Sequence, residues 1–132
     1  MPKSTGYGEQ PGLDVAIGPV VQQIVPASVH GLASSVVASG NSLSNLLFAD
    51  GYKILSVGAT SSQAGQIQVQ RYIDDGGQIA QGAAVTASLT ANTPAVVNVT
   101  DGLPFSSYTV KITNTGGSTA NLTNVVILQQ AQ

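Results

Sequence analysis

The 132-residue chain contains no cysteine and no tryptophan, a single histidine, and only 8% charged residues. Without cysteine it can form no disulfide, no thiolate metal site and no cysteine nucleophile. Ordinary soluble proteins carry about 25% charged residues, so the surface of this chain must consist largely of neutral side chains. These absences argue against catalysis. We expect a protein that is not an enzyme and that uses no cofactor and no metal.

The few charges are spread along the chain. Four basic residues, Lys3, Lys53, Arg71 and Lys111, stand against six acidic ones, which gives a net charge of −2. Nucleic-acid binding needs clustered cations that displace counterions from phosphates, so we expect no nucleic-acid partner. Net charge normally keeps a protein dispersed, and a surface with so little charge is typical of a chain covered in an assembly. The composition therefore predicts self-association.

Hydrophobic residues make up 42% of the chain, which is enough apolar surface for one folded domain of this length. No apolar run approaches the ~18 residues that a membrane-spanning helix needs. The first nine residues also lack the apolar core of a signal peptide. We therefore expect no membrane partner, and synthesis in a bacterial cytoplasm.

Residues 1–28 differ in composition from the rest. Four prolines punctuate the segment: Pro2, Pro11, Pro19 and Pro26. Proline removes a backbone donor and is unfavourable in helices and central strands, so an extended arm is predicted. The aliphatic side chains expected to contact a partner are Leu13, Val15, Ile17, Val20, Val21, Ile24 and Val25. Two interpretations stay open, an arm on a neighbouring subunit or partner and an arm packed along its own domain.

Residues 29–132 read as strands separated by turns. The expected strands are 34–39, 43–49, 52–60, 66–73, 84–90, 95–100, 107–114 and 122–129, of which 43–49 could instead be a helical turn. Regular spacing with turn punctuation is typical of an antiparallel sandwich. We predict an all-β fold, an antiparallel β-sandwich of about eight strands in a jelly roll, preceded by the extended arm.

Alternation assigns the faces of these strands. The inward face of the strand at 66–73 is predicted to consist of Ile67, Val69, Arg71 and Ile73, and its wet face of Gln66, Gln68, Gln70 and Tyr72. In the strand at 107–114, Tyr108, Val110 and Ile112 oppose Thr109, Lys111 and Thr113. The continuous apolar run at 125–128 predicts burial on both faces.

Candidate catalytic and metal-binding residues are few. His30 is the one group that ordinarily titrates near neutrality, but no orienting carboxylate or nucleophile motif accompanies it. The Asp-Asp-Gly-Gly sequence at 74–77 predicts a hairpin turn, whose carboxylates accept local backbone N–H bonds and in which Gly76 takes a positive φ. A Ca²⁺ site formed by Asp74 or Asp75 with loop carbonyls is the alternative. Asp50 and Asp101 each precede glycine and are also interpreted as turn residues.

Four stretches carry a resemblance to a known group of proteins. They are DGYKILSV at 50–57, GQIQVQ at 65–70, DGLPF at 101–105 and YTVKITNTGG at 108–117. Together they resemble small β-sandwich structural proteins of tailed bacteriophages, and are similar to the jelly-roll cement or decoration proteins of icosahedral heads. The resemblance covers roughly residues 50–128 and consists of strand and turn types.

The resemblance implies a function. The chain would be a non-enzymatic virion structural protein that binds and stabilises the outer capsid surface. Its partners would be the major capsid protein and itself, as a homotrimer. Because related sandwiches also occur in tails and fibres, the alternative is a receptor- or glycan-binding module of a phage tail or fibre.

Overall fold

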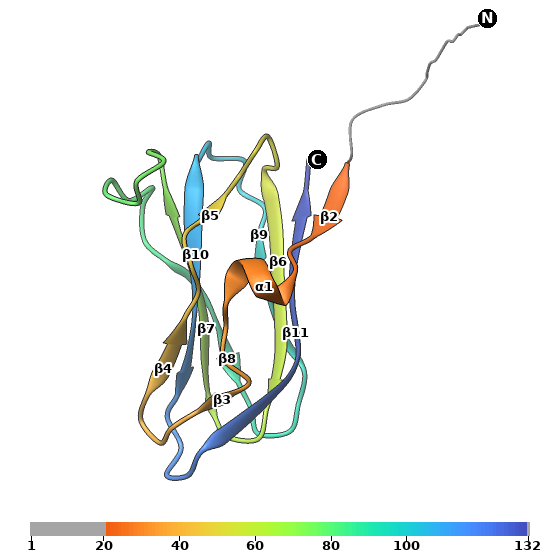
Figure 1. Cartoon of the computed structure of the whole chain (residues 1–132), viewed down its shortest axis with the longest axis vertical. Helices are drawn as coiled ribbons and strands as arrows, with labels where there is room; N and C mark the ends of the chain where they lie inside the picture. The colour runs from red at the N-terminus through yellow and green to blue at the C-terminus, as the bar shows by residue number, and fades with distance from the viewer. Residues whose placement is uncertain (1–20, 132) are drawn as a thin grey trace, which may run out of the picture.

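The structure is a computed structural model that describes residues 21–131. It shows the alternation of inward and outward side chains that the sequence predicts. Buried and outward residues alternate along the long strands because successive side chains of a strand point to opposite faces. The strands form two five-stranded antiparallel sheets, packed face to face (Figure 1). The predicted all-β antiparallel sandwich is confirmed.

We name each sheet after one of its central strands. The β10 sheet contains β4 (Asn41–Leu43), β5 (Leu47–Phe48), β7 (Gly65–Tyr72), β8 (Val85–Leu89) and β10 (Ser107–Asn114). The β11 sheet contains β2 (Gln22–Ile24), β3 (Ser35–Val36), β6 (Ile54–Ser61), β9 (Ala95–Val99) and β11 (Ala120–Gln130).

The ten strands occupy eight positions. β4 and β5 pair with different parts of β10, and β2 and β3 with different parts of β11. The strand orders are β4-β10-β7-β8 and β2-β11-β6-β9. From β6 onward, every connection except β7–β8 passes from one sheet to the other. This alternation between two four-position sheets is the topology of a jelly roll, as the sequence predicted.

The inward side chains form one core between the sheets. Leu55, Val57, Ile67 and Val69 are fully buried at its centre. Tyr108 is also fully buried, and its hydroxyl accepts a hydrogen bond of 2.8 Å from Nε2 of Gln129. Burial raises the pKa of Tyr108 to about 12. The alternation predicted for 107–114 is confirmed, since Tyr108, Val110 and Ile112 are buried, whereas Ile73 at the end of the strand at 66–73 is 51% exposed.

The prediction that residues 125–128 are buried on both faces is wrong. Ile127 is fully buried, but Val126 is 39% exposed on the outside of the β11 sheet. The register between β11 and β6 shifts between Thr123 and Val126, where Asn124 has a φ of 53°. Such a bulge re-aims the residues that follow it. Beyond it, β11 alternates again, with one apolar row inside and one outside.

The described part of the predicted arm joins the β11 sheet. β2 pairs antiparallel with β11, and the backbone N–H of Val25 donates to Ile127 O at 2.9 Å. Val21 and Ile24 are 63% and 61% exposed, whereas Val25 packs into the core of its own chain at 7%. The remaining residues of the predicted contact set lie outside the described residues: Leu13, Val15, Ile17 and Val20.

A single helical turn follows this strand and was not expected from the sequence. α1 (Ala27–His30) begins after Pro26 and ends at Gly31, whose φ is 68°. In Figure 1 it lies between the ribbons of the two sheets. The turn is tied to the β4–β5 connection, because the Asn45 side chain donates to Val29 O at 3.0 Å. The predicted boundary at residue 28 therefore falls inside α1.

Candidate functional site

The outer face of the β10 sheet carries mostly neutral polar side chains. We call it the amide face; its outward residues are Asn41, Leu43, Phe48, Gln66, Gln68, Gln70, Tyr72, Thr86, Ser88, Ser107, Thr109, Lys111 and Thr113. The face exists because alternation sends the apolar residues of four strands inward and leaves amides and hydroxyls outside. The sequence placed the residues of β7 and β10 correctly.

Strand register arranges these side chains in rows across the sheet. In the middle row Lys111 lies opposite both Leu43 on β4 and Gln68 on β7, and Gln68 lies opposite Thr86 on β8. Directly opposed residues have their Cβ atoms about 4.5–5.5 Å apart, so a row forms a continuous surface. A ligand that lies across the strands would meet four side chains in succession.

A hollow of about 340 Å³ lies on this face. It is lined by Leu43, Gln68, Gln70, Tyr72, Ala84, Thr109 and Lys111. Within residues 21–131 the side chains of Gln68 and Lys111 have no hydrogen-bond or ion-pair partner. Gln70 is held in place, because its Nε2 donates to the carbonyls of Arg71 and Gly82 at 2.9 and 3.1 Å. The hollow thus combines one fixed amide with free donors and acceptors and the Tyr72 ring.

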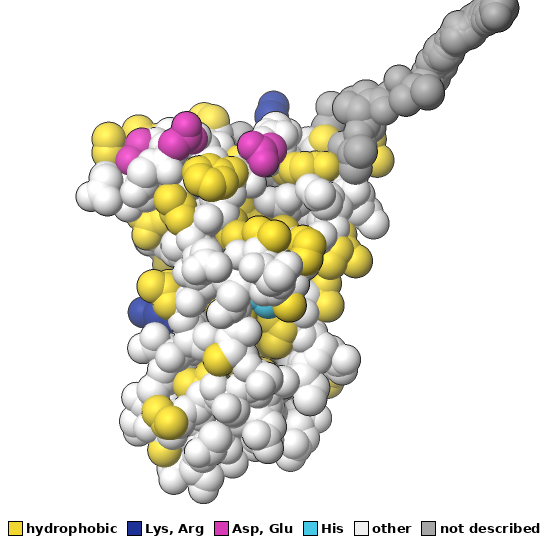
Figure 2. All heavy atoms as spheres, viewed as in Figure 1, with side chains coloured by type: hydrophobic (Ala, Val, Ile, Leu, Met, Phe, Trp, Pro, Cys, Tyr) yellow, Lys and Arg dark blue, Asp and Glu magenta, His cyan; other side chains and the backbone are white. Residues whose placement is uncertain are grey.

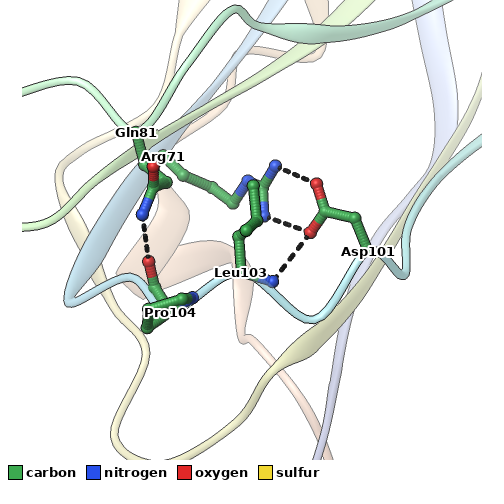
Figure 3. A network of polar contacts seen from close by, with 5 residues as sticks. All are labelled: Arg71, Gln81, Asp101, Leu103 and Pro104. Carbon is green, nitrogen blue, oxygen red and sulfur yellow. Dashed lines mark hydrogen bonds and ion pairs between the residues drawn. The ribbon is translucent and has the colours of Figure 1, made fainter.

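Beneath this face an ion pair, buried on the arginine side only, joins β7 to the loop that follows β9. Arg71 of β7 is 3% exposed, and its two terminal nitrogens each lie 2.7 Å from a carboxylate oxygen of Asp101, after β9 (Figure 3). This bidentate contact lowers the pKa of Asp101 to about 2. The guanidinium also lies 5.7 Å from the centre of the Phe105 ring. The sequence placed Arg71 inward but did not reveal its partner.

Further hydrogen bonds fix the loops around the ion pair (Figure 3). The N–H of Leu103 donates to Oδ1 of Asp101 at 3.1 Å. Gln81, in the β7–β8 connection, donates from its backbone N–H to Arg71 O and from its side chain to Pro104 O, both at 2.8 Å. The buried Nε of Arg71 has no partner among the described residues. This network holds the frame of the amide face, and none of these groups lines the hollow.

His30, the histidine considered as a catalytic candidate from the sequence, is buried and bonded to backbone. His30 is 4% exposed, and its Nδ1 accepts the backbone N–H of Leu32 at 3.0 Å. Burial lowers the pKa of the imidazole, which favours its neutral form. Within residues 21–131 the structure brings no carboxylate to His30, whose side-chain hydrogen bond joins it to backbone.

The acidic turn forms as the sequence predicted, with differences at Asp75 and Gly76. Asp74 accepts the backbone N–H groups of Gln78 and Ile79 at 2.9–3.0 Å, and the Ile79 bond is the main cause of the lowered pKa of Asp74. Asp75 accepts the hydroxyl of Ser106. The positive φ belongs to Gly77, at 67°, and not to Gly76. Asp74 thus serves the turn as predicted, whereas Asp75 joins the turn to the loop before β10 and accepts no local backbone N–H.

The described part of the chain contains neither a metal-binding cluster nor a membrane-spanning helix. Among residues 21–131 no three His, Asp or Glu side chains gather closely enough to hold a metal ion. No helix in that range is long and apolar enough to cross a membrane. In Figure 2 acidic side chains gather near one end of the sandwich, and neutral surface covers most of the visible remainder.

The outer face of the β11 sheet differs in chemistry. We call the apolar face the cluster of Ile24, Gly58, Val96, Val126 and Leu128 on this side of the sheet; the neutral polar residues Ser56, Thr60, Asn98 and Asn124 border it. Gly58 of β6 lies opposite Val126 on one side and Val96 on the other, so a trough of about 310 Å³ runs over the glycine. Ile24 and Val96 are 61% and 55% exposed. No charged side chain lines the trough.

A third hollow, of about 260 Å³, opens between the sheets beside α1. Its lining is largely apolar and includes Val25, Val29, Leu46 and Phe48. Of these, Val25 belongs to the core, whereas Val29 and Phe48 are 50% and 48% exposed. The hollow offers fewer free polar groups than the amide face.

No protein-family model matches the chain, and no curated protein matches it. Among solved structures, the PBSX exported protein XepA superposes with a TM-score of 0.58 at 12% identity, over 84% of this chain and 37% of XepA. The CBM36-1 domain of a multidomain xylanase from the hindgut metagenome of Trinervitermes trinervoides superposes with a TM-score of 0.50 at 13% identity. That match covers 84% of this chain and 98% of the domain.

These likenesses show the fold: the chain is a β-sandwich structurally similar to carbohydrate-binding modules and to part of XepA. The chain spans little more than a third of XepA. Neither structure is described as a capsid protein, so they give no support to the virion and capsid functions expected from the sequence.

Proposed function

We propose that this chain is a non-enzymatic module that binds glycan through the amide face. This is the alternative function that the sequence left open. The observation that carries it is the hollow lined by Gln68, Gln70, Tyr72, Thr109 and Lys111, in which donors and acceptors stand free beside an aromatic ring.

Sugars suit such a surface for chemical reasons. Each hydroxyl of a pyranose both donates and accepts, and a glutamine amide offers both functions on one side chain. The apolar face of a sugar ring packs on an aromatic ring, which Tyr72 supplies at one end of the hollow. Binding sites are mostly concave with a few placed polar groups, and this hollow has that form.

The likeness to a CBM36 domain supports the same proposal at the level of architecture, because that domain is by name a carbohydrate-binding module. At 13% identity the likeness assigns no role to any residue. The residues of the proposed site therefore rest on the geometry of the amide face alone.

A glycan array probed with the full chain tests the proposal, followed by calorimetry with the best-bound oligosaccharide. Tyr72→Ala is expected to weaken binding about tenfold, since loss of a stacked ring removes on the order of 1.4 kcal/mol. Gln68→Ala is expected to weaken it by a similar factor.

Matched controls lie elsewhere on the molecule. Tyr52→Ala removes a partly exposed tyrosine that does not line the hollow, and Gln22→Ala removes an exposed glutamine of β2. Both should leave the affinity unchanged. A blank array, or equal losses in the controls, would overturn the proposal.

A second candidate is the virion function: a homotrimer that cements an outer capsid surface by binding the major capsid protein. The observation that favours it is the exposed apolar face, since a contact with a neighbour would cover it. Cryo-EM of particles from a host producing the chain separates the two. Many copies on the head support cementing, and density confined to a tail or fibre supports a receptor- or glycan-binding module.

A further inference from the structure

The apolar face is exposed although its five residues carry no polar side chain, and only neutral hydroxyl and amide side chains border it. Ile24, Val96 and Val126 present 61%, 55% and 39% of their surface to solvent. Val96 and Val126 flank Gly58 directly, and Ile24 lies opposite Leu128 in the next row, so the three residues belong to one patch. Contiguous apolar surface of this kind usually marks a docking site.

The face is the wrong size for two sandwiches packed flat against each other. Four strands about 4.8 Å apart and five residues at about 3.3 Å each give roughly 15 by 17 Å. That is roughly 250 Å² in projection, well below the ~800 Å² per partner of a stable interface. A trough with a glycine floor instead fits a narrow occupant, such as one extended segment.

The chain itself contains such a segment. Twenty residues precede Val21, and residues 11–20 hold aliphatic side chains at alternate positions, Leu13, Val15 and Ile17, with one charged residue, Asp14. Alternation would give an extended segment one apolar side. At about 3.3 Å per residue, ten residues reach about 33 Å, which is more than enough to cross the sheet.

The direction of β2 selects which copy the segment reaches. Gln22 pairs with Gln130 near the end of β11, and Ala131 N donates to Val21 O at 2.8 Å. Going backwards along the chain from Val21 therefore leads past the end of the sheet, away from Val126. Reaching the face of its own chain would require an immediate reversal of the segment.

We propose that residues 11–20 of one copy dock in the trough of the apolar face of a second copy. Neutral apolar side chains would then meet a lining without charge, so no ion is desolvated. Reciprocal exchange of arms adds the area that a flat contact lacks, and two linked contacts strengthen each other. The proposal does not depend on glycan binding, which uses the opposite face.

The absence of cysteine allows a direct test in the full chain. Single-cysteine variants Leu13→Cys, Val15→Cys and Ile17→Cys are each mixed with a size-tagged Val126→Cys or Val96→Cys chain and mildly oxidised. A disulfide needs the two Cβ atoms within about 3.5–4.5 Å, so only docked residues cross-link efficiently. We expect at least one mixture to give tagged–untagged dimer about tenfold above the control.

The control pairs the same arm variants with Leu43→Cys, which is 59% exposed on the amide face. Sedimentation of the unmodified chain should show an oligomer. A monomer, or cross-linking no better than with Leu43→Cys, would overturn the proposal. So would a double variant, Ile17→Cys with Val126→Cys, that closes its disulfide within one chain, since the arm would then cover its own face.

Discussion

The two outer faces of this sandwich arise from the same alternation and yet differ in chemistry. On the β10 sheet the outward positions of β7 are Gln66, Gln68 and Gln70, whereas on the β11 sheet the outward positions near the centre of β11 are Val126 and Leu128. The inner layers of both sheets are equally apolar. The need to bury a core therefore explains why the inward side chains of each sheet are apolar, but it does not explain the outward ones. The other side is free to serve a ligand or a partner, which is why we propose a separate contact for each face.

The largest effect is expected from breaking the ion pair between Arg71 and Asp101, which supports the sheets beneath both faces. Asp101→Asn leaves the guanidinium of the buried Arg71 without its anionic partner, which links β7 to the loop after β9. We expect a loss of about 2 kcal/mol in the free energy of unfolding, moderated because the Asp101 side chain is 46% exposed. Urea unfolding measures it. Both faces should be weakened together, and a change confined to one would contradict a common support.

The same ion pair predicts a dependence on acid. The pKa of Asp101 is about 2 in the folded chain, below the ~3.9 of an unfolded aspartate. A depressed folded pKa stabilises above the unfolded value, so this contribution is complete above about pH 4 and is lost as the pH falls through 2. Thermal unfolding between pH 5 and 2 should show the fall. In Asp101→Asn the fall should be smaller.

A smaller effect is expected from replacing two valines of the apolar face by threonine, which gives this face hydroxyl groups like those of the amide face. Val96→Thr with Val126→Thr keeps the shape of both side chains and adds hydroxyls to the apolar face. We expect the dissociation constant of the oligomer to rise about tenfold, since the transfer of two methyl-sized groups into a docked contact is lost. Sedimentation measures it. Leu43→Thr on the amide face is the control and should leave the constant unchanged.

A substitution at Gly58, on the floor of the trough, is expected to change fold stability and self-association in opposite directions. A Cβ at Gly58 would lie 3.5 Å from Ala95 O and 3.7 Å from Val96 Cγ2, which are ordinary contacts. Gly58→Ala is therefore expected to stabilise the fold by about 0.5–1 kcal/mol by reducing the freedom of the unfolded chain. It should weaken self-association at the same time, because it raises the floor of the trough. Stronger association would contradict the docked arm.

The smallest effect is expected from salt. Exposed charges are screened beyond ~10 Å at 0.1 M ionic strength, but the trough has no charged lining. Raising NaCl from 0.05 to 1 M should change the dissociation constant of the oligomer by less than about twofold. Sedimentation in both buffers measures it, and release by salt would show that charge carries the contact.

The sequence predicted the parts of the fold that depend on local alternation. The strand at 107–114 was placed with the bounds that β10 has, and the inward set of β7 included Arg71. Glycine after aspartate marked the turns at 50–51 and 101–102, where both glycines take a positive φ, but at 75–76 the positive φ falls one residue later, on Gly77. These predictions succeed since each depends on residues within a few positions of each other.

What failed depends on distant residues. The run at 125–128 is apolar on both sides, and a sequence does not distinguish a side chain buried in its own core from one exposed for another chain. The bulge before Val126 and the ion pair of Arg71 with Asp101 join segments far apart in sequence. The amide face needed the register of four strands. Alternating threonines in 107–114 beside alternating glutamines in 66–70 were the one signal that could have indicated it.

The strand order also bears on how the chain acquires its structure during synthesis. β10 and β11, the last strands in order, occupy central positions, between β4 and β7 in one sheet and between β2 and β6 in the other. Until both have left the ribosome, β2 and β4 have no neighbour to pair with, and β6 and β7 each lack one. Sheets built from such distant pairings also form slowly. A nascent chain paused before residue 107 would therefore present open strand edges. Because the chain carries few charges, chaperones and its neutral polar side chains would have to protect these edges from aggregation.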